Sequence, residues 1–195
     1  IEDTDHTRNK KESIDSILKG LEWLGLKHDD EIIYQSKKIK EHQKIINQLI
    51  ENNCAYKCFH TDEEILELKK NNKKLESKWR NKFDHPKNTQ FCVRIKSPLN
   101  GQTTINDKIQ GIVTVENKEL DDFVIMRSDG SPTFLLSSAV DDFLMSITDI
   151  IRGDDHLTNS FRQMIIFNYL NYNPTFSHMP LIHNENNEKL SKRHN

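Results

Sequence analysis

The sequence has 195 residues, of which 30% are charged and 34% are apolar, and its formal net charge is −2. This size and composition fit one soluble domain, or one domain that carries an insertion. No apolar stretch approaches the roughly 20 residues that a helix needs to cross a bilayer. The sequence has three cysteines, Cys54, Cys58 and Cys92. This number is small and odd, which argues against a disulfide framework. We therefore expect free thiols, a cytoplasmic location and no membrane partner.

Helical patterns dominate the start of the chain. Apolar residues recur at helical spacing over residues 7–25, where Gly25 ends the run, and again over residues 35–52. Thr61, followed three positions later by Glu64, forms a capping-box pattern, which predicts the start of a third helix. The first residue, Ile1, is not a methionine, so we expect the chain to be a piece of a longer protein.

A basic stretch, residues 69–87, follows the start of this third helix. Its cations are Lys69, Lys70, Lys73, Lys74, Lys78, Arg80, Lys82 and Lys87, opposed only by Glu76 and Asp84. The common behaviour of such a run is a solvated helix face followed by a loop. The alternative is a surface that contacts nucleic-acid phosphates. Charge alone does not separate the two readings.

Short β-rich runs then replace the helical pattern. We predict strands over 91–96, 112–116 and 123–127, a turn over 128–132, a helix over 134–145, a buried strand over 147–151, a helix over 157–170, a strand near 178–182 and a mobile loop over 184–195. Strands that alternate with helices indicate a parallel sheet. The predicted fold class is therefore an α/β domain, interrupted by an α+β insertion at roughly residues 53–130.

Metal chemistry has weak support in the sequence. Cys58 and His60 have the spacing of half a metal site, but a zinc site needs a second pair, and Cys92 stands alone. The common phosphate-loop, dinucleotide-binding, zinc-protease and nucleophile-elbow motifs are absent from the sequence. We expect no bound zinc.

Three short segments carry possible binding chemistry. Residues 189–193, with the sequence KLSKR, place two lysines around a small serine, an arrangement that can reach phosphate oxygens or can be an ordinary basic loop. Arg152 lies where an apolar strand ends, the edge at which open α/β sheets bind ligands, and a guanidinium there can grip a carboxylate. Asp154 and Asp155 can instead neutralise Arg152 in a structural ion pair. The acidic residues 2–5 suit helix capping, or the binding of an ammonium group or a metal.

Together these segments resemble a known family. The sequences IEDTD, DDFVIMRSDGSPT, VDDFLM, IRGDDHLTNSFRQ and HMPLIHNENNEKLSKR resemble, in order and spacing, the catalytic region of bacterial glutamyl-tRNA synthetases, which are class I enzymes. KLSKR resembles the class I KMSKS signature. The resemblance implies a Rossmann-like parallel sheet interrupted by an α+β connective insertion. It divides the chain into a first catalytic part (1–52), an acceptor-stem-binding insertion (53–130) and a second catalytic part (131–195) that ends in the KMSKS-like loop.

The resemblance also implies roles for individual residues. Those implied for glutamate are Glu2, which would hold the α-ammonium, and Arg152, which would grip the side-chain carboxylate. Those implied for ATP are Asp155, His156, Leu181 and Ile182 near the ribose and adenine, and Lys189 and Lys192, the catalytic lysines, on the phosphates. Asp5 and Arg8 match positions near the terminal adenosine of tRNA.

Two residues depart from the family pattern. Phe134 falls where the family commonly has a tyrosine that hydrogen-bonds glutamate, and Ser138 falls where some members have asparagine. Both positions belong to the implied glutamate site, so the departures bear on how glutamate is held there. The insertion also lacks the cysteine of zinc-binding members.

The activity implied is ATP-dependent joining of glutamate to tRNA, with Mg²⁺ bound to the ATP. The implied partners are glutamate, ATP and tRNA(Glu), with tRNA(Gln) as a further candidate, and the implied state is a monomer. A HIGH-type motif would precede Ile1 and anticodon-binding helices would follow Asn195, so this piece alone is expected to be inactive. Two alternatives compete: a truncated, non-catalytic tRNA-binding paralogue, and the queuosine-modifying glutamyl paralogue. The intact KLSKR and IRGDDH segments argue against the first, and the SDGSPT segment and the arginine after KLSK argue against the second.

Overall fold

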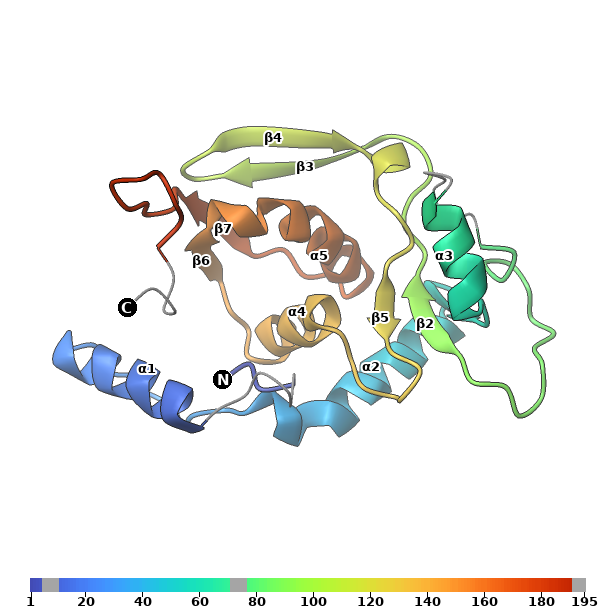
Figure 1. The fold of residues 1–195 in the computed structure, drawn as a ribbon, viewed down its shortest axis with the longest axis horizontal. Coiled ribbons are helices and arrows are strands. Elements are labelled where there is room, and N and C mark those ends of the chain that lie inside the picture. Colours follow the sequence, from blue (N-terminus) through green and yellow to red (C-terminus); the bar gives the residue numbers. More distant parts are fainter. Residues whose placement is uncertain (5–10, 71–76, 191–195) are drawn as a thin grey trace.

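A computed structural model describes residues 1–4, 11–70 and 77–190, and Figure 1 shows its elements. The α-helices are α1 (Lys11–Trp23), α2 (Ile39–Glu51), α3 (Asp62–Lys70), α4 (Phe134–Leu144) and α5 (Leu157–Tyr169). The strands are β1 (Ala55–Cys58), β2 (Cys92–Ile95), β3 (Gln102–Asp107), β4 (Gly111–Glu116), β5 (Val124–Met126), β6 (Asp149–Gly153) and β7 (Thr175–Met179). Short 3₁₀ turns are η1 (Gln35–Lys38), η2 (Asn117–Glu119) and η3 (Asp154–His156).

The strands form two sheets. One is antiparallel, in the order β1-β2-β5, and the other has the order β4-β3-β7-β6. In the second sheet β7 runs parallel to both of its neighbours, β3 and β6, whereas β3 and β4 form an antiparallel hairpin. The chain passes from β6 through α5 to β7, which is the strand–helix–strand crossover that parallel pairing requires. The predicted α/β class is confirmed.

The apolar core joins the helices to both sheets. Its fully buried members include Ile46 of α2, Ile125 of β5, Leu136 of α4 and Phe167 of α5. Figure 1 shows α5 lying between the β3–β4 hairpin and α4, so that the helix is covered on two sides. Burial of such side chains, at about 1.5–3 kcal/mol each, is the main force that holds the elements together.

The predicted helices are present in the described part of the chain, with residues 7–10 of the first one outside it and residues 35–38 of the second forming the 3₁₀ turn η1, and the strands near the site are displaced. Strand β6 begins at Asp149 rather than at residue 147, because the Ile147 N–H still bonds to the Asp142 carbonyl (2.9 Å) at the end of α4. Ile151 is 66% exposed, so the expectation of a wholly buried strand was wrong. Strand β7 ends at Met179 rather than continuing to residue 182, because Pro180 has no N–H for the ladder.

Two strands were not predicted from the sequence, β1 and β3. Strand β3 lies in the predicted insertion, yet it pairs with β7 of the second catalytic part at Asp107 and Phe176. The insertion is thus tied into the parallel sheet by one of its own strands. The division at residues 52/53 and 130/131 stays a prediction.

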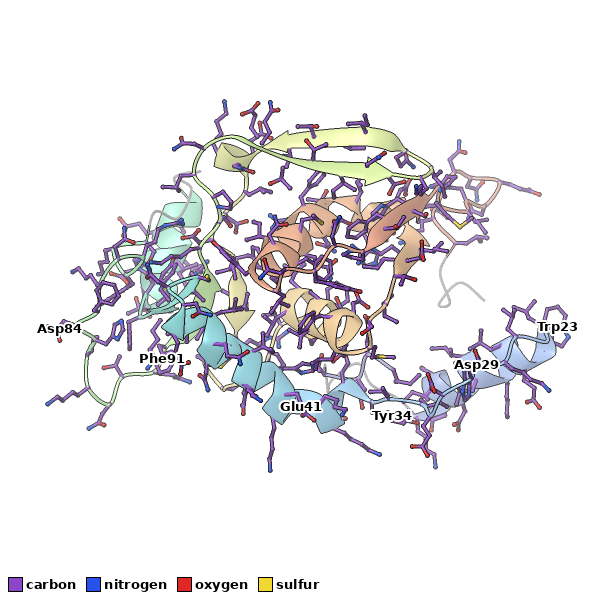
Figure 2. The ribbon with its side chains drawn as sticks, turned by 180° about the vertical axis from the view of Figure 1, so that it is seen from behind. Trp23, Asp29, Tyr34, Glu41, Asp84 and Phe91 are labelled. Atoms are coloured by element: carbon purple, nitrogen blue, oxygen red, sulfur yellow. The ribbon has the colours of Figure 1, made fainter. Side chains whose placement is uncertain are left out.

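Helix α1 projects from the rest of the molecule, and Trp23 lies near its outer end in Figure 2. Trp23 is 84% exposed, and none of the residues of α1 is buried. Gly25 ends the helical run with a φ of 71°, a conformation that glycine adopts without strain. None of the helices in the described ranges is long and apolar enough to span a membrane.

Candidate functional site

Arg152 lies at the carboxyl end of β6, directly opposite His178 of β7 in the parallel register. Its Nη2 donates to the Ser160 hydroxyl and to the Gln163 Oε1, both at 2.6 Å, and its Nε donates to the His178 Nε2 at 3.3 Å. The guanidinium carbon also lies 5.9 Å from the centre of the Phe176 ring. Strand and helix residues therefore fix the guanidinium at the predicted edge of the sheet.

Carboxylates surround this arginine without touching it. Burial lowers the pKa of Arg152, and the charges of Asp142, Glu2 and Asp155 act in the opposite direction. The pKa of Asp142 is raised to about 6, mainly by burial of its carboxyl group. The charge of Arg152 lowers this pKa, and the charges of Asp141 and Glu2 raise it. Among the described residues no ion pair joins Arg152 to Asp154 or Asp155, so the structural ion pair considered from the sequence does not form.

In the acidic segment at the start of the chain, Asp3 and Glu2 have different surroundings. The Asp3 carboxylate accepts from the Ser36 N–H (2.8 Å) and hydroxyl (2.6 Å), and so it holds the beginning of η1. Glu2 is solvent-accessible but closely surrounded by protein, and this desolvation raises its pKa against the opposing charges of His156 and Arg152. The capping role therefore falls to Asp3, and Glu2 stays available next to the arginine.

The two residues that depart from the family pattern lie beside this centre. Ser138 is buried in α4, and its hydroxyl accepts from the Gln163 Nε2 at 2.5 Å. Ser138 thus reaches Arg152 indirectly, through Gln163. Phe134, the first residue of α4, has its ring centre 5.8 Å from that of His156.

A second part of the site follows β6. Asp155 forms an ion pair with Lys189, which lowers the pKa of the Asp155 carboxyl. The chain before Lys189 folds back, with the Leu190 N–H bonded to the Ile182 carbonyl at 2.9 Å, and Ile182 is 74% exposed. Leu181 lies close to Gly153, since a Cβ on that glycine would be 3.0 Å from the leucine side chain.

The structure therefore gathers most of the predicted site residues at one edge of the parallel sheet. These are Glu2, Phe134, Ser138, Arg152, Asp155, His156, Leu181, Ile182 and Lys189. Asp5, Arg8 and Lys192 lie outside the described residues. Sequence reasoning missed Asp107, Asp142, Ser160, Gln163 and His178, although a histidine on an apolar strand next to an arginine strand was an available signal for the last.

The half metal site has other partners. Cys58 lies opposite Cys92 in the antiparallel register of β1 and β2, and a hydrogen bond from Cys92 lowers the pKa of Cys58. His60 Nδ1 lies 2.9 Å from the Glu64 carboxylate. Across residues 1–4, 11–70 and 77–190, no three metal-ligating side chains cluster. The absence of zinc stays a prediction, to be checked by metal analysis of the purified protein.

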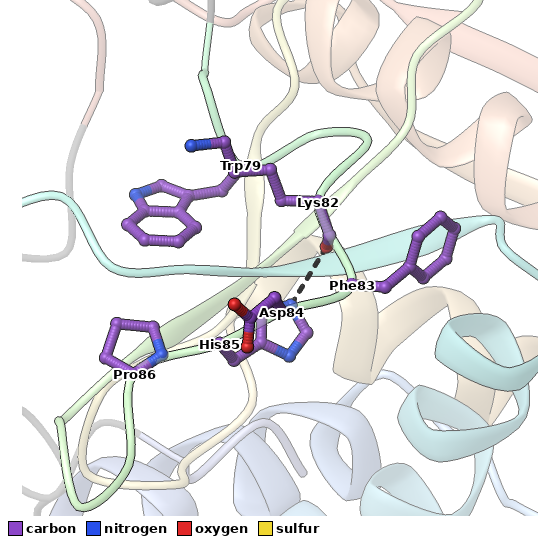
Figure 3. Close-up of a pocket in the computed structure, with 6 residues that line it drawn as sticks. All are labelled: Trp79, Lys82, Phe83, Asp84, His85 and Pro86. Atoms are coloured by element: carbon purple, nitrogen blue, oxygen red, sulfur yellow. Dashed lines mark hydrogen bonds between the residues drawn. The ribbon is translucent and has the colours of Figure 1, made fainter.

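Residues 71–76 of the basic stretch, with Lys73 and Lys74, lie outside the described residues, and the cations after them are of two kinds. Arg80 belongs to the fold, because it pairs with the buried Asp122 and donates to the Ser97 carbonyl at 2.7 Å. Lys82 lies over the Trp79 ring, 5.3 Å from its centre, at an open pocket of about 560 Å³. Figure 3 shows this pocket, with the ring of Trp79 on one side and Pro86 and His85 below it. The pocket lies in the predicted insertion, on the chain between α3 and β2, which Figure 1 shows on the opposite side of the molecule from β6.

Parallel strands with an arginine and a lysine-bearing loop at their carboxyl ends define an α/β domain of the class that binds ligands at this edge of the sheet. Comparison with known families identifies the particular domain. The family model described as "tRNA synthetases class I (E and Q), catalytic domain" matches residues 1–195, and the chain belongs to this family.

Individual relatives agree with this assignment. A protein named glutamate–tRNA ligase 2 from Ehrlichia chaffeensis is 50% identical over 201 residues, and glutamate–tRNA ligase 1 from Erythrobacter litoralis is 43% identical over 208 residues. Both alignments cover 100% of this chain and 43% of the relative, so the chain spans less than half the length of these proteins.

Solved structures show the same architecture. The crystal structure of a glutamate tRNA ligase from Elizabethkingia meningosepticum, in complex with its amino acid, has a TM-score of 0.86 and 29% identity, with 99% of this chain and 44% of that chain covered. The glutamate-tRNA synthetase from Elizabethkingia anophelis has a TM-score of 0.85 and 29% identity, with 99% and 45% covered. The predicted family and the predicted class I Rossmann-like fold are confirmed.

Proposed function

We propose that the protein of which this chain is a catalytic part is a glutamate–tRNA ligase. The observation that carries the proposal is the fixed, half-buried guanidinium of Arg152. Three of its five N–H groups are bonded to Ser160, Gln163 and His178, and no hydrogen bond from its Nη1 reaches any residue in the described part of the chain. Both donors of Nη1 are therefore available for a carboxylate, which is the group that distinguishes glutamate from glutamine.

Glutamate recognition needs a second contact, for the α-ammonium. Glu2 supplies a carboxylate in the electrostatic field of Arg152, so cation and anion sites lie side by side, as the two ends of a zwitterionic amino acid require. Phe134 in place of the family's tyrosine removes one hydrogen-bonding hydroxyl from this pocket. We expect Arg152 and Glu2 to account for most of the selectivity for glutamate.

ATP would occupy the second part of the site. His156, Leu181 and Ile182 would border the ribose and adenine, with Asp155 beside them. Lys189, which is paired with Asp155 at the surface, would exchange that partner for phosphate oxygens. Lys192 would act alongside it. ATP enters as its magnesium complex, so the ion is part of the substrate.

The proposed reaction has two steps. The α-carboxylate of glutamate attacks the α-phosphorus of ATP, forming glutamyl-adenylate and releasing pyrophosphate. A terminal ribose hydroxyl of tRNA then attacks the activated carbonyl and releases AMP. Neither step demands a strong acid or base from the protein, so catalysis rests on positioning and on lysine charges that stabilise the phosphates.

The partners proposed for the whole protein are glutamate, ATP and tRNA(Glu), with tRNA(Gln) as a second substrate to be tested. Asp5 and Arg8 would contact the terminal adenosine, and the insertion would contact the acceptor stem. We propose a monomer located in the cytoplasm. Charging assays with each purified tRNA, and the sedimentation behaviour of the full-length protein, test these points directly.

The central test replaces Arg152 with alanine in the full-length enzyme. The variant loses a charge-assisted contact in a desolvated pocket, so kcat/KM for glutamate should fall. The fall should correspond to a loss of about 2–4 kcal/mol of transition-state stabilisation. ATP–pyrophosphate exchange at varied glutamate measures this loss, and KM for ATP serves as the internal control. An unchanged kcat/KM for glutamate would remove Arg152 from the site.

A further inference from the structure

His178 and Asp107 form a buried pair behind Arg152. The Asp107 Oδ2 lies 2.6 Å from the His178 Nδ1, and both side chains are fully excluded from solvent. Asp107 ends β3 and so comes from the predicted insertion, whereas His178 belongs to β7. The pair therefore joins the hairpin of the insertion to the sheet that carries Arg152.

The carboxylate of Asp107 is held in its ionised form. Its Oδ1 accepts from the N–H groups of Ile109 and Gln110, both at 2.9 Å, and the His178 N–H adds contacts of 3.1 Å to both oxygens. Burial alone would raise the pKa of Asp107, but these hydrogen bonds outweigh it and lower the pKa to about 2. An anion therefore faces the Nδ1 of His178.

The other nitrogen of His178 faces a group that can only donate. Arg152 Nε carries a proton under all ordinary conditions, and it points at the His178 Nε2. That nitrogen must then be unprotonated, because two N–H groups cannot bond to each other. The single ring proton of a neutral His178 therefore sits on Nδ1, where Asp107 accepts it. The Ser160 hydroxyl lies 2.8 Å from the same Nε2 and 3.2 Å from the His156 carbonyl, so its one proton can be donated to either.

This tautomer determines where the guanidinium points. Nε is anchored on His178, and Nη2 is anchored on Ser160 and Gln163, so the two remaining donors of Nη1 are directed away from the protein contacts. Phe176 adds a flat support, since its ring lies nearly parallel to that of His178, at 14° with centres 5.8 Å apart. Each anchor removes a rotation that the long arginine side chain would otherwise have.

We propose that Asp107 and His178 are positioning residues for glutamate recognition, with Asp107 fixing the His178 tautomer that accepts from Arg152 and so aims the guanidinium at the substrate carboxylate. This inference rests on the proposed function of Arg152. It deepens that function by tying glutamate selectivity to a residue of the insertion. Both side chains are excluded from solvent, so neither would touch the substrate.

The test uses Asp107→Asn in the full-length enzyme. Asparagine keeps an oxygen at the Oδ1 position for the backbone bonds, but it places an NH₂ group opposite the His178 Nδ1. The ring proton then moves to Nε2, where it faces the Arg152 Nε–H. We expect KM for glutamate to rise by about 10- to 100-fold in ATP–pyrophosphate exchange, as one charge-assisted contact is misdirected, with KM for ATP within about twofold of wild type.

Two variants of the histidine provide an independent arm, which stays informative if Asp107→Asn does not fold. His178→Gln keeps an acceptor for Arg152 and a donor for Asp107, so KM for glutamate should stay within about threefold of wild type. His178→Leu has similar volume and no acceptor, and should raise that KM about as much as Asp107→Asn. The control is Asp129→Asn, because Asp129 caps a surface turn through the Ser131 N–H (2.8 Å) and should leave both KM values unchanged.

The tautomer itself is measured by ¹⁵N NMR of the histidine-labelled enzyme, with His178→Gln assigning the signal. A protonated Nδ1 that becomes unprotonated in Asp107→Asn supports the proposal, and a protonated Nε2 in the wild type overturns it. Equal shifts in the KM values for glutamate and ATP, or a wild-type glutamate KM in Asp107→Asn, also overturn it. Arg152→Ala in the same series keeps the two ideas apart: an unchanged glutamate KM in that variant counts against the proposed function instead.

Discussion

Gly153 ends β6 next to the residues proposed to bind ATP, and its lack of a side chain has a spatial cause. A Cβ at this position would lie 2.6 Å from the Asp155 Oδ1 and 3.0 Å from the Leu181 side chain. Its φ of −65° is open to any residue, so backbone conformation does not require glycine here. A Cβ would displace the Asp155 carboxylate, which is the end of an exposed side chain, and would crowd the tip of Leu181.

At the scale of this residue we predict that Gly153→Ala destabilises the protein by about 1 kcal/mol, because the Asp155 carboxylate must turn aside and lose its ion pair with Lys189. Chemical denaturation of the full-length protein measures the change. The matched control is Gly20→Ala in the middle of α1, where a Cβ would meet nothing within 4 Å. Alanine there should not reduce stability, since it favours a helix by up to about 1 kcal/mol over glycine. Equal losses in both variants would show that crowding at Gly153 is unimportant.

Among the elements, α3 has the best-defined beginning. The Glu64 N–H donates to the Thr61 hydroxyl at 3.2 Å, and the Thr61 N–H donates to the Glu64 carboxylate at 3.0 Å, which confirms the capping box predicted from the sequence. Lys78 reaches the other oxygen of the same carboxylate at 2.9 Å. The first turn of α3 is thus tied to the chain that returns from the helix.

We predict that Thr61→Ala lowers the stability of α3 by about 0.5–2 kcal/mol, and that Thr61→Ser restores most of it. Hydrogen exchange of the α3 amides measures this locally. Lys78, together with the Thr61 N–H and His60, lowers the pKa of Glu64 to about 2. The stabilisation from the ionised Glu64 is therefore fully present above the unfolded pKa of about 4.3 and is lost as the pH falls toward 2. Unchanged protection in Thr61→Ala would contradict the capping role.

The helices were predictable because each has a local signal. Apolar spacing, the Thr61–Glu64 pair and residues that tolerate positive φ after the helix all lie within a few positions of the element they define. Asn53, Ser146 and Asn171, with φ values of 57°, 54° and 52°, follow α2, α4 and α5 in this way. A local signal is sufficient for a helix because its hydrogen bonds are local.

The missed strands have no comparable signal. Strand β3 has the sequence QTTIND, in which only Ile105 and Asp107 are buried, so its inward face carries a carboxylate where an apolar residue would be expected. That carboxylate is tolerated because His178 and three N–H groups satisfy it, and His178 lies 71 residues further along the chain. Arg152 and Lys189 could be predicted as site residues because they lie within family motifs. Asp107 could not, because its role depends on a partner that is distant in the sequence.

On the scale of the whole molecule, the described cations of the basic stretch differ in their tasks. Arg80 is engaged with Asp122 and Ser97, and Lys78 with Glu64, whereas Lys82 and Lys87 have no ion-pair partner within the described residues. Figure 2 shows Asp84 in the outer part of this region, at the opposite end of the molecule from Trp23. Lys82 and Lys87 are thus the residues best able to meet an RNA backbone.

We predict that Lys82→Gln with Lys87→Gln weakens tRNA binding to the full-length enzyme and reduces its log–log salt slope by about 0.7–0.9 for each lost phosphate contact. ATP binding should be unaffected. The charge-matched control is Lys40→Gln with Lys44→Gln, two exposed lysines of α2. A salt slope that is unchanged in the Lys82/Lys87 variant would favour the solvated-face reading of the basic stretch.

The position of β7 between β3 and β6 also has a consequence for biosynthesis. A chain is made from its N-terminus, so the β3–β4 hairpin and β6 leave the ribosome before the strand that joins them exists. Until residues 175–179 emerge, Asp107 has no histidine to bond and its carboxylate must stay hydrated. Contacts this distant in sequence form slowly, because a long loop must close before they are made. The nascent protein therefore passes through a stage in which Ser160 and Gln163 of α5 have been made and can bond to Arg152, but His178 has not.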